Sequence, residues 1–484
     1  MNLGLSPGHG LCIWLTLCSL AVCLAVPPAA QGRDSTSGES GVVEGVLGFE
    51  LDYDSGNMGL YALSSCLRAC AAATPYSNIT GFSRSAFKFV YDSTEAYEPL
   101  RDLYPIDALS EAAREIGFGE CRWDTGKSID EVKALVKQEI DQGRPLIAPF
   151  LKPDAYHGFF IITGYDYVEN IFYLQGAFSL DSGYVSMPVP ASWDGPTASP
   201  GGWASNPIFV LGKGRFAMGR PGVKERKSVR DAIRLYEGGT LEYGTHIGEF
   251  AYMAAPGPHT AYYGFPAYDI LSQDVSNAPL LVEREGESVV NFGLLWRLDA
   301  QLGQLQHDRR HGAAYMKGMA TELLTDQRML LAEIVEDFGN LAEDVAALRK
   351  IFWDRVPEDA GTDQIAKYIE EGNSIVFSIP AGEGIVSGLR ARGHDTYGTP
   401  WGPVVIADSP EKRLRAKLLV KTISSRERNS FNIMQQIVEY IGRLEPDAVK
   451  RARQSRPYDK PGGPQDRERE ESPAVDPDGV EDNE

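Results

Sequence analysis

The residues of this sequence that could carry nucleophilic chemistry are a few cysteines and a histidine that opens an apolar strand. Beyond residue 32 the chain contains Cys66, Cys70 and Cys121, and His157 begins the run HGFFIITGY. A cysteine becomes a nucleophile when an imidazole accepts its proton, so Cys66 and His157 are one candidate catalytic pair. Cys66 and Cys70 lie four residues apart on a predicted helix, which is a poor geometry for a disulfide. The other interpretation of Cys66 is a small apolar thiol in the core.

The elements that would position these residues follow from hydrophobic periodicity and capping signals. Helices are predicted over 57–73, 107–116 and 128–143. The third opens with the capping box Ser128–Glu131, and Gly143 ends it. Strands are predicted at 145–150, 157–165, 171–174 and 207–211. Helices followed by antiparallel strands form an α+β arrangement, which we assign to residues 44–212.

Two segments carry a resemblance to a known family. The run Gly143–Ile147 precedes the strand 156–166, which begins Tyr-His-Gly and ends Gly-Tyr-Asp. Together with the order of helices and strands, this resembles the papain-like cysteine peptidases. Within that fold, residues 44–212 resemble the bacteriocin-processing (double-glycine leader) peptidases and the N-terminal domain of the butirosin acyl-transfer protein, which implies a bacterial protein.

The resemblance implies where the catalytic residues of the family would fall. The family pattern Asp-Cys-Gly-x-x-Ala-Leu falls on residues 57–63 and puts Met58 at the nucleophile. His157 takes the position of the base, and Gln175 and Gly176 fall where the family has its orienting residue. A thioether has no ionisable proton, so this resemblance implies an inactive peptidase-like domain. His157 and Gln175 would then be polar contacts for a peptide or small ligand in the former cleft.

Two alternatives keep an enzyme. In the first, Cys66 and His157 form an active cysteine peptidase or acyl transferase. Cys66 lies eight residues after Met58, about 12 Å along a helix, whereas a base needs contact at roughly 3 Å. In the second, Ser55, just ahead of the helix, pairs with His157. A further alternative is a non-enzymatic interaction protein that acts through the helical domain described next.

Residues 213–450 form a predicted second domain that is mainly helical with a few strands. Leucine stripes near 295–305 and 331–348 are typical of bundle core, and strands are predicted at 374–379 and 403–407. The patch 262–269 weakly resembles the segment that follows the papain-like domain in related bacterial proteins. His307 and His311 have a spacing that can bind zinc, but the arginines between them favour a solvated face. No recognised metal or cofactor motif is present, so we expect neither.

The ends and the charge of the chain limit its partners. Residues 11–26 form an uncharged apolar run, too short for a membrane span but suited to a signal peptide over 1–32. We therefore expect an exported protein, periplasmic or extracellular, or a membrane-anchored one if this segment is not cleaved. A linker over 33–43 and a disordered, charged tail over 451–484 complete the predicted organisation. The net charge of -20 argues against nucleic acid as a partner.

Overall fold

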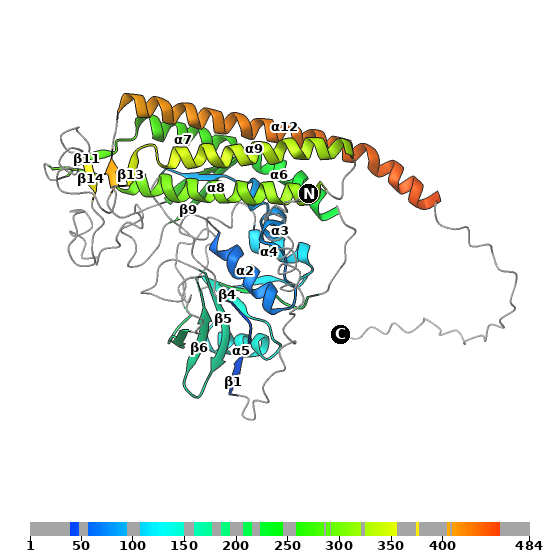
Figure 1. Ribbon diagram of the computed structural model, residues 1–484. Coiled ribbons are helices and arrows are strands. Elements are labelled where there is room, and N and C mark those ends of the chain that lie inside the picture. The colour runs from blue at the N-terminus through cyan, green and yellow to red at the C-terminus, as the bar shows by residue number, and fades with distance from the viewer. Residues whose placement is uncertain are drawn as a thin grey trace, which may run out of the picture. The chain divides into compact units, whose positions relative to one another are not determined.

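The computed structural model describes residues 39–47, 57–93, 107–149, 159–176, 185–193, 207–214, 223–244, 258–284, 287–290, 292–320, 325–355, 374–376, 404–406 and 409–454. The fold is mixed α+β, with an antiparallel sheet in the N-terminal part and a helical C-terminal region (Figure 1). The predicted signal peptide, Ser55 and His157 lie outside the described residues, as does the tail beyond residue 454.

The N-terminal sheet has the strand order β3-β8-β4-β5-β6-β7, and β1 pairs with the far end of β5. Its strands are β1 (Ser40–Val42), β3 (Arg122–Asp124), β4 (Leu146–Pro149), β5 (Phe159–Asp166), β6 (Ile171–Gln175), β7 (Val185–Pro188) and β8 (Ile208–Val210). The strands predicted near 145, 157, 171 and 207 are confirmed, and the described strand pairs of this sheet are antiparallel. Residues 40–42, predicted as linker, instead form β1, whose partner lies too far along the chain for a local pattern to reveal it.

Local signals explain the N-terminal helices. In α2 (Met58–Ala69) the side chain of Asn57 accepts a hydrogen bond from the Leu60 N–H at 3.1 Å and caps the helix start. The predicted end of α4 (Ala108–Ile116) at Gly117 is confirmed by a φ of 121° there. The predicted capping box at the start of α5 (Ile129–Ile140) is also present. The short helices α3 (Tyr76–Phe82) and η1 (Ser85–Phe87) were not predicted, because they carry no comparable signal.

A second sheet crosses the predicted domain boundary at residue 212. Strand β2 (Val90–Asp92) pairs with β10 (Pro258–Tyr263), which pairs in turn with β9 (Gly239–Gly244). Contacts group Met1–Val438 into one compact unit and Glu439–Glu484 into another. The division into 44–212 and 213–450 therefore stays a prediction, and the first segment already contributes a strand to the second.

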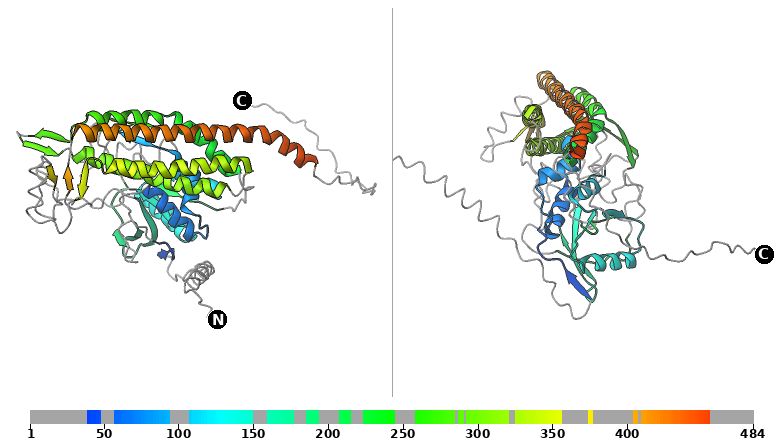
Figure 2. Two further views of the ribbon diagram at one scale, coloured as in Figure 1. Left: turned by 45° about the horizontal axis from the view of Figure 1, so that its top comes forward. Right: turned by 90° about the vertical axis from the view of Figure 1, so that its right-hand side faces the viewer.

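The helical region is built on the predicted leucine stripes. It contains α6 (Val223–Glu237), α7 (Phe265–Asn277), α8 (Phe292–Met319), α9 (Thr325–Arg349) and α12 (Pro410–Gln454), with the short strands β11 (Leu281–Arg284), β12 (Glu287–Val290), β13 (Trp353–Arg355), β14 (Ser374–Val376) and β15 (Val404–Ile406). Figures 1 and 2 show α8, α9 and the first part of α12 side by side. Their buried side chains include Leu302, Val345 and Val420 in one apolar cluster. The predicted strands near 374 and 403 are confirmed, and α12 continues four residues into the predicted tail.

Candidate functional site

Three chain segments converge at one end of the N-terminal sheet. A Cβ atom on Gly59, at the start of α2, would lie 3.2 Å from the ring of Phe159, the first residue of β5. Gln175, the last residue of β6, pairs with Ile161 of β5, and a Cβ on Gly176 would lie 3.1 Å from the ring of Phe160. The start of a helix, the start of one strand and the end of its neighbour therefore meet at this place, which we call the sheet end.

The sheet end contains three of the predicted site residues, Met58, Gln175 and Gly176. Met58 is the first residue of α2 and is buried, with 7% of its surface exposed. Gln175 and Gly176 are also buried. His157 precedes the described part of β5 by two residues. The polar groups described here, Asn57 and Gln175, are neutral amides that exchange hydrogen bonds but do not supply a nucleophile.

Cys66 does not belong to the sheet end. It lies in the middle of α2 with no exposed surface, and burial, followed by the nearby Cys70, raises the pKa of its thiol. Burial also raises the pKa of Cys70, to about 11, and that of Cys121. An activated thiolate needs the opposite shift, so none of these three thiols has the properties of a catalytic nucleophile. Cys66 and Cys121 are buried, and Cys70 is partly buried.

The histidines of α8 lie in a partly buried aromatic cluster, and the predicted solvated face is wrong. His307 Nε2 lies 2.8 Å from the hydroxyl of Tyr61, and the ring of His311 lies edge-on to Tyr76 with centroids 4.8 Å apart. The spacing and charges of α8 could not reveal this, because the covering residues come from α2 and α3. Burial and then the neighbouring His307 lower the pKa of His311 to about 4. No group of three or more His, Cys, Asp or Glu residues in the described part could hold a metal ion.

Arg309, between these histidines, is fully buried in a joint of four elements. Its Nε lies 2.5 Å from Oε1 of Glu427 in α12, and the Tyr268 hydroxyl donates to the same oxygen at 2.9 Å. Arg309 also donates to the carbonyl of Ala86 in η1 at 2.8 Å. We call these residues the arginine joint. No local pattern in the sequence predicts this joint, because its two charged residues lie 118 positions apart along the chain.

A second buried arginine connects α4 and α6. Arg84 is 2% exposed and pairs with Glu111 at 2.8 Å and with Asp231 at 2.6 Å. Its backbone has a φ of 64°, an uncommon conformation for a side chain of this size. Lys227 of α6 joins the same carboxylates. This network fixes helices from both predicted domains to each other.

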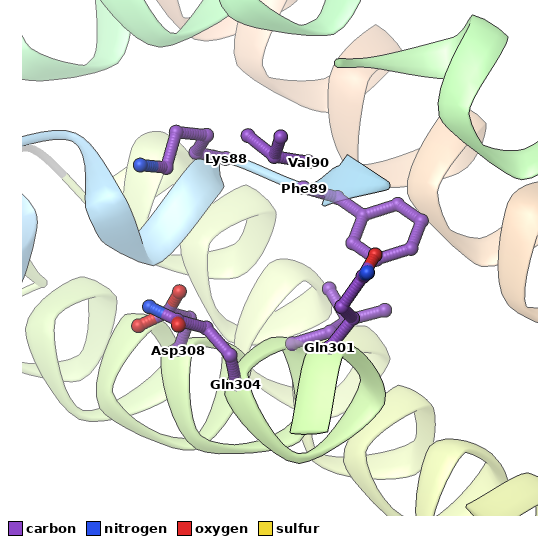
Figure 3. Close-up of a pocket in the computed structure, with 7 residues that line it drawn as sticks. Lys88, Phe89, Val90, Gln301, Gln304 and Asp308 are labelled. Carbon is purple, nitrogen blue, oxygen red and sulfur yellow. The ribbon is translucent and has the colours of Figure 1, made fainter. Parts of the chain in front are cut away.

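A small pocket lies between β2 and α8. Lys88, Phe89 and Val90 line it from the β2 side, and α8 contributes the lining residues Gln301, Gln304, Leu305 and Asp308 (Figure 3). Its cavity volume is about 10 Å³, so it is far smaller than the pockets that take drug-sized ligands.

Comparisons with known proteins found no relative of this chain. No protein-family model, curated protein or solved structure matches the chain. The resemblance to papain-like peptidases therefore stays a prediction from the residues. Among the described residues, no helix combines the length and apolar character needed to cross a membrane.

Proposed function

We propose that this chain is an exported, peptidase-like protein that binds a peptide or small ligand at the sheet end without cleaving it. The observation that carries the proposal is the meeting of the α2 start, the β5 start and the β6 end. This is where a papain-like enzyme would hold its nucleophile, base and orienting residue. Here the helix start presents Met58, whose thioether has no proton to lose. Recognition would then rest on hydrogen bonds, to which Gln175 and His157 contribute.

The active-enzyme alternative has less support. Cys66 is two helical turns from Met58, has no exposed surface and has a raised thiol pKa. A catalytic cysteine must be accessible and must ionise near neutral pH. An interaction role through the helical region stays open as an outcome of the binding experiment below.

The experiment uses the full chain and a fluorescein-labelled synthetic peptide that ends in Gly-Gly, the substrate feature of the resembled family. Saturable binding is measured by fluorescence anisotropy, and the peptide is recovered intact by mass spectrometry. Gln175→Ala and His157→Ala should each weaken binding about five- to tenfold, the effect of one lost hydrogen bond. Gln142→Ala, on an exposed turn, is the control and should bind as the wild type does.

Cleavage of the peptide would overturn the proposal, as would the absence of saturable binding up to millimolar concentration. Equal binding by the wild type and both sheet-end variants would point to the helical region instead. Point substitutions are preferable to truncation at residue 213, because truncation would remove β10, the partner of β2. It would also remove α8, whose Arg309 donates to η1.

A further inference from the structure

The outer edge of β2 is covered by side chains of α8 instead of another strand. Gln301 Oε1 accepts from the N–H of Asp92 at 2.9 Å, and Gln301 Nε2 donates to its carbonyl at 3.1 Å. Arg309 Nη1 donates to the carbonyl of Lys88 at 3.2 Å. Residues 88 and 92 of this edge therefore both have partners on α8.

The backbone of Val90, between them, faces the same side. In an antiparallel pair, alternate residues direct their N–H and C=O groups toward the partner strand. The Gly264 N–H donates to the carbonyl of Phe89, so the backbone N–H and C=O groups of Phe89 and Tyr91 are directed toward β10. The N–H and C=O groups of Val90 are therefore directed toward α8, where the small pocket lies.

The wall of this pocket on α8 carries buried polar atoms that no described residue satisfies. Asp308 is 1% exposed, and its Oδ1 accepts no hydrogen bond from any residue of the described part. His307 Nδ1 lies 3.7 Å from this oxygen, beyond hydrogen-bond distance, and it too has no hydrogen-bond partner in the described part. Gln304 Nε2 likewise has no acceptor among the described residues. A buried carboxylate oxygen without a donor is costly, so a donor from outside the chain is expected there.

We propose that the pocket binds one ordered water molecule, which hydrogen-bonds the backbone of Val90 between the two residues whose backbone groups α8 already binds. The cavity volume of about 10 Å³ has room for roughly one water. Water donates to Asp308 and to the Val90 carbonyl, and it accepts from Gln304 Nε2. Figure 3 shows the Lys88 ammonium across the pocket from Asp308 and Gln304, which disfavours a metal cation and favours a neutral molecule that is both donor and acceptor.

The test compares the wild-type chain with Asp308→Asn and Asp308→Leu. Asparagine keeps an acceptor, whereas leucine removes it and fills space with apolar atoms. Water-oxygen (17O) magnetic relaxation dispersion counts long-lived internal waters in solution. We expect Asp308→Asn to match the wild type and Asp308→Leu to have one such water fewer. A high-resolution crystal structure of the wild type should show a peak within about 2.6–3.2 Å of Asp308 Oδ1.

Three results would overturn the proposal. The first is an unchanged count of long-lived waters in a folded Asp308→Leu variant. The second is a direct ion pair between Lys88 Nζ and Asp308 in the crystal. The third is an anomalous signal at the site after potassium is replaced by rubidium, which would identify a cation. If the leucine variant does not fold, Gln304→Leu provides the same comparison from the neighbouring wall of the pocket.

Discussion

The sheet end and the arginine joint use polar side chains in opposite ways. At the sheet end the described polar groups are neutral amides, those of Asn57 and Gln175, and the first residue of the helix is a methionine. At the arginine joint an arginine and a glutamate are both fully buried and hydrogen-bonded to each other. The arginine joint therefore uses buried charges to hold together segments that lie far apart in the sequence. The polar groups described at the sheet end carry no charge.

This difference shows that a shifted pKa does not by itself identify the functional site. Burial and the Glu427 carboxylate raise the pKa of Tyr268, yet that tyrosine only donates to Glu427 inside the joint. Structural ion pairs perturb pKa values as strongly as catalytic groups do. The sheet end is instead distinguished by where elements start and stop. The substitutions below test whether the two regions are as separate as this comparison requires.

The largest expected effect is at the arginine joint. Arg309→Ala leaves Glu427 buried without its charged partner, so we expect a loss of about 3–5 kcal/mol in the free energy of unfolding. Urea unfolding followed by circular dichroism measures it. Arg310→Ala is the matched control, because Arg310 is 58% exposed and its pairing distance to Glu343 is 3.9 Å. The control should change stability by less than about 0.5 kcal/mol.

A double variant sharpens that result. Replacing both partners, as in Arg309→Met with Glu427→Leu, removes the uncompensated charge and should recover most of the lost stability. Equal losses for Arg309→Ala and Arg310→Ala would show that the joint does not hold the region together. Peptide binding at the sheet end should survive in any variant that remains folded.

The Arg84 network should give the next largest effect. Arg84→Ala removes ion pairs to Glu111 and Asp231, both of which keep partial solvent exposure, so we expect a loss of about 2–3 kcal/mol in unfolding free energy. Arg114→Ala, whose side chain is 51% exposed beside the same Glu111, is the control. A loss at Arg84 no greater than at Arg114 would contradict this role.

The contact between α3 and α8 predicts a smaller effect. A Cβ atom on Gly81 would overlap the ring of Tyr315, so Gly81→Ala should destabilise the chain by about 1–2 kcal/mol. A Cβ on Gly339, in the middle of α9, meets nothing within 4 Å. Gly339→Ala should therefore stabilise by about 0.5–1 kcal/mol through helix propensity. Thermal unfolding of both variants checks the opposite signs, and a stable Gly81→Ala variant would refute the tight packing.

The last expected effect is a pH dependence of stability at His311. Its pKa is lowered from 6.5 to about 4 in the folded chain, so the unfolded chain binds the proton first as the pH falls. Stability should therefore decrease as the pH falls from about 6.5 toward 4, and His311→Phe should remove that part of the decrease. The difference between the two proteins in urea midpoint at pH 7 and pH 5 measures it. Identical pH profiles would contradict the burial of this imidazole.

Local signals predicted much of the N-terminal architecture. The capping box at Ser128 and the glycine stop at Gly117 depend on residues within one helical turn, and both are present. The strand runs near 145, 157 and 171 are long and apolar enough to be recognised from composition. These local features were enough to predict the described part of the sheet end, including Met58 at the start of a helix.

Pairings between distant segments could not be predicted in the same way. Strand β2 has only three residues, and its partner lies more than 160 residues later. The run His307–His311 looks polar on its own, and its burial follows from Tyr61 and Tyr76, which belong to other helices. When residues from other elements bury a charged helix, the hydrophobic pattern of that helix does not change. The arginine joint on α8 could therefore not be predicted from the sequence.

The central claim is that the sheet end has the geometry for a thiol but carries Met58 in its place. Thiol alkylation by iodoacetamide at neutral pH, followed residue by residue with mass spectrometry, tests it in the wild type, in Met58→Cys and in Met58→Cys with His157→Ala. We expect slow labelling of Cys66 throughout, and a new cysteine at position 58 that reacts about tenfold faster only while His157 is present. Fast labelling of Cys66 in the wild type, or a position-58 thiol that is indifferent to His157, would contradict the account.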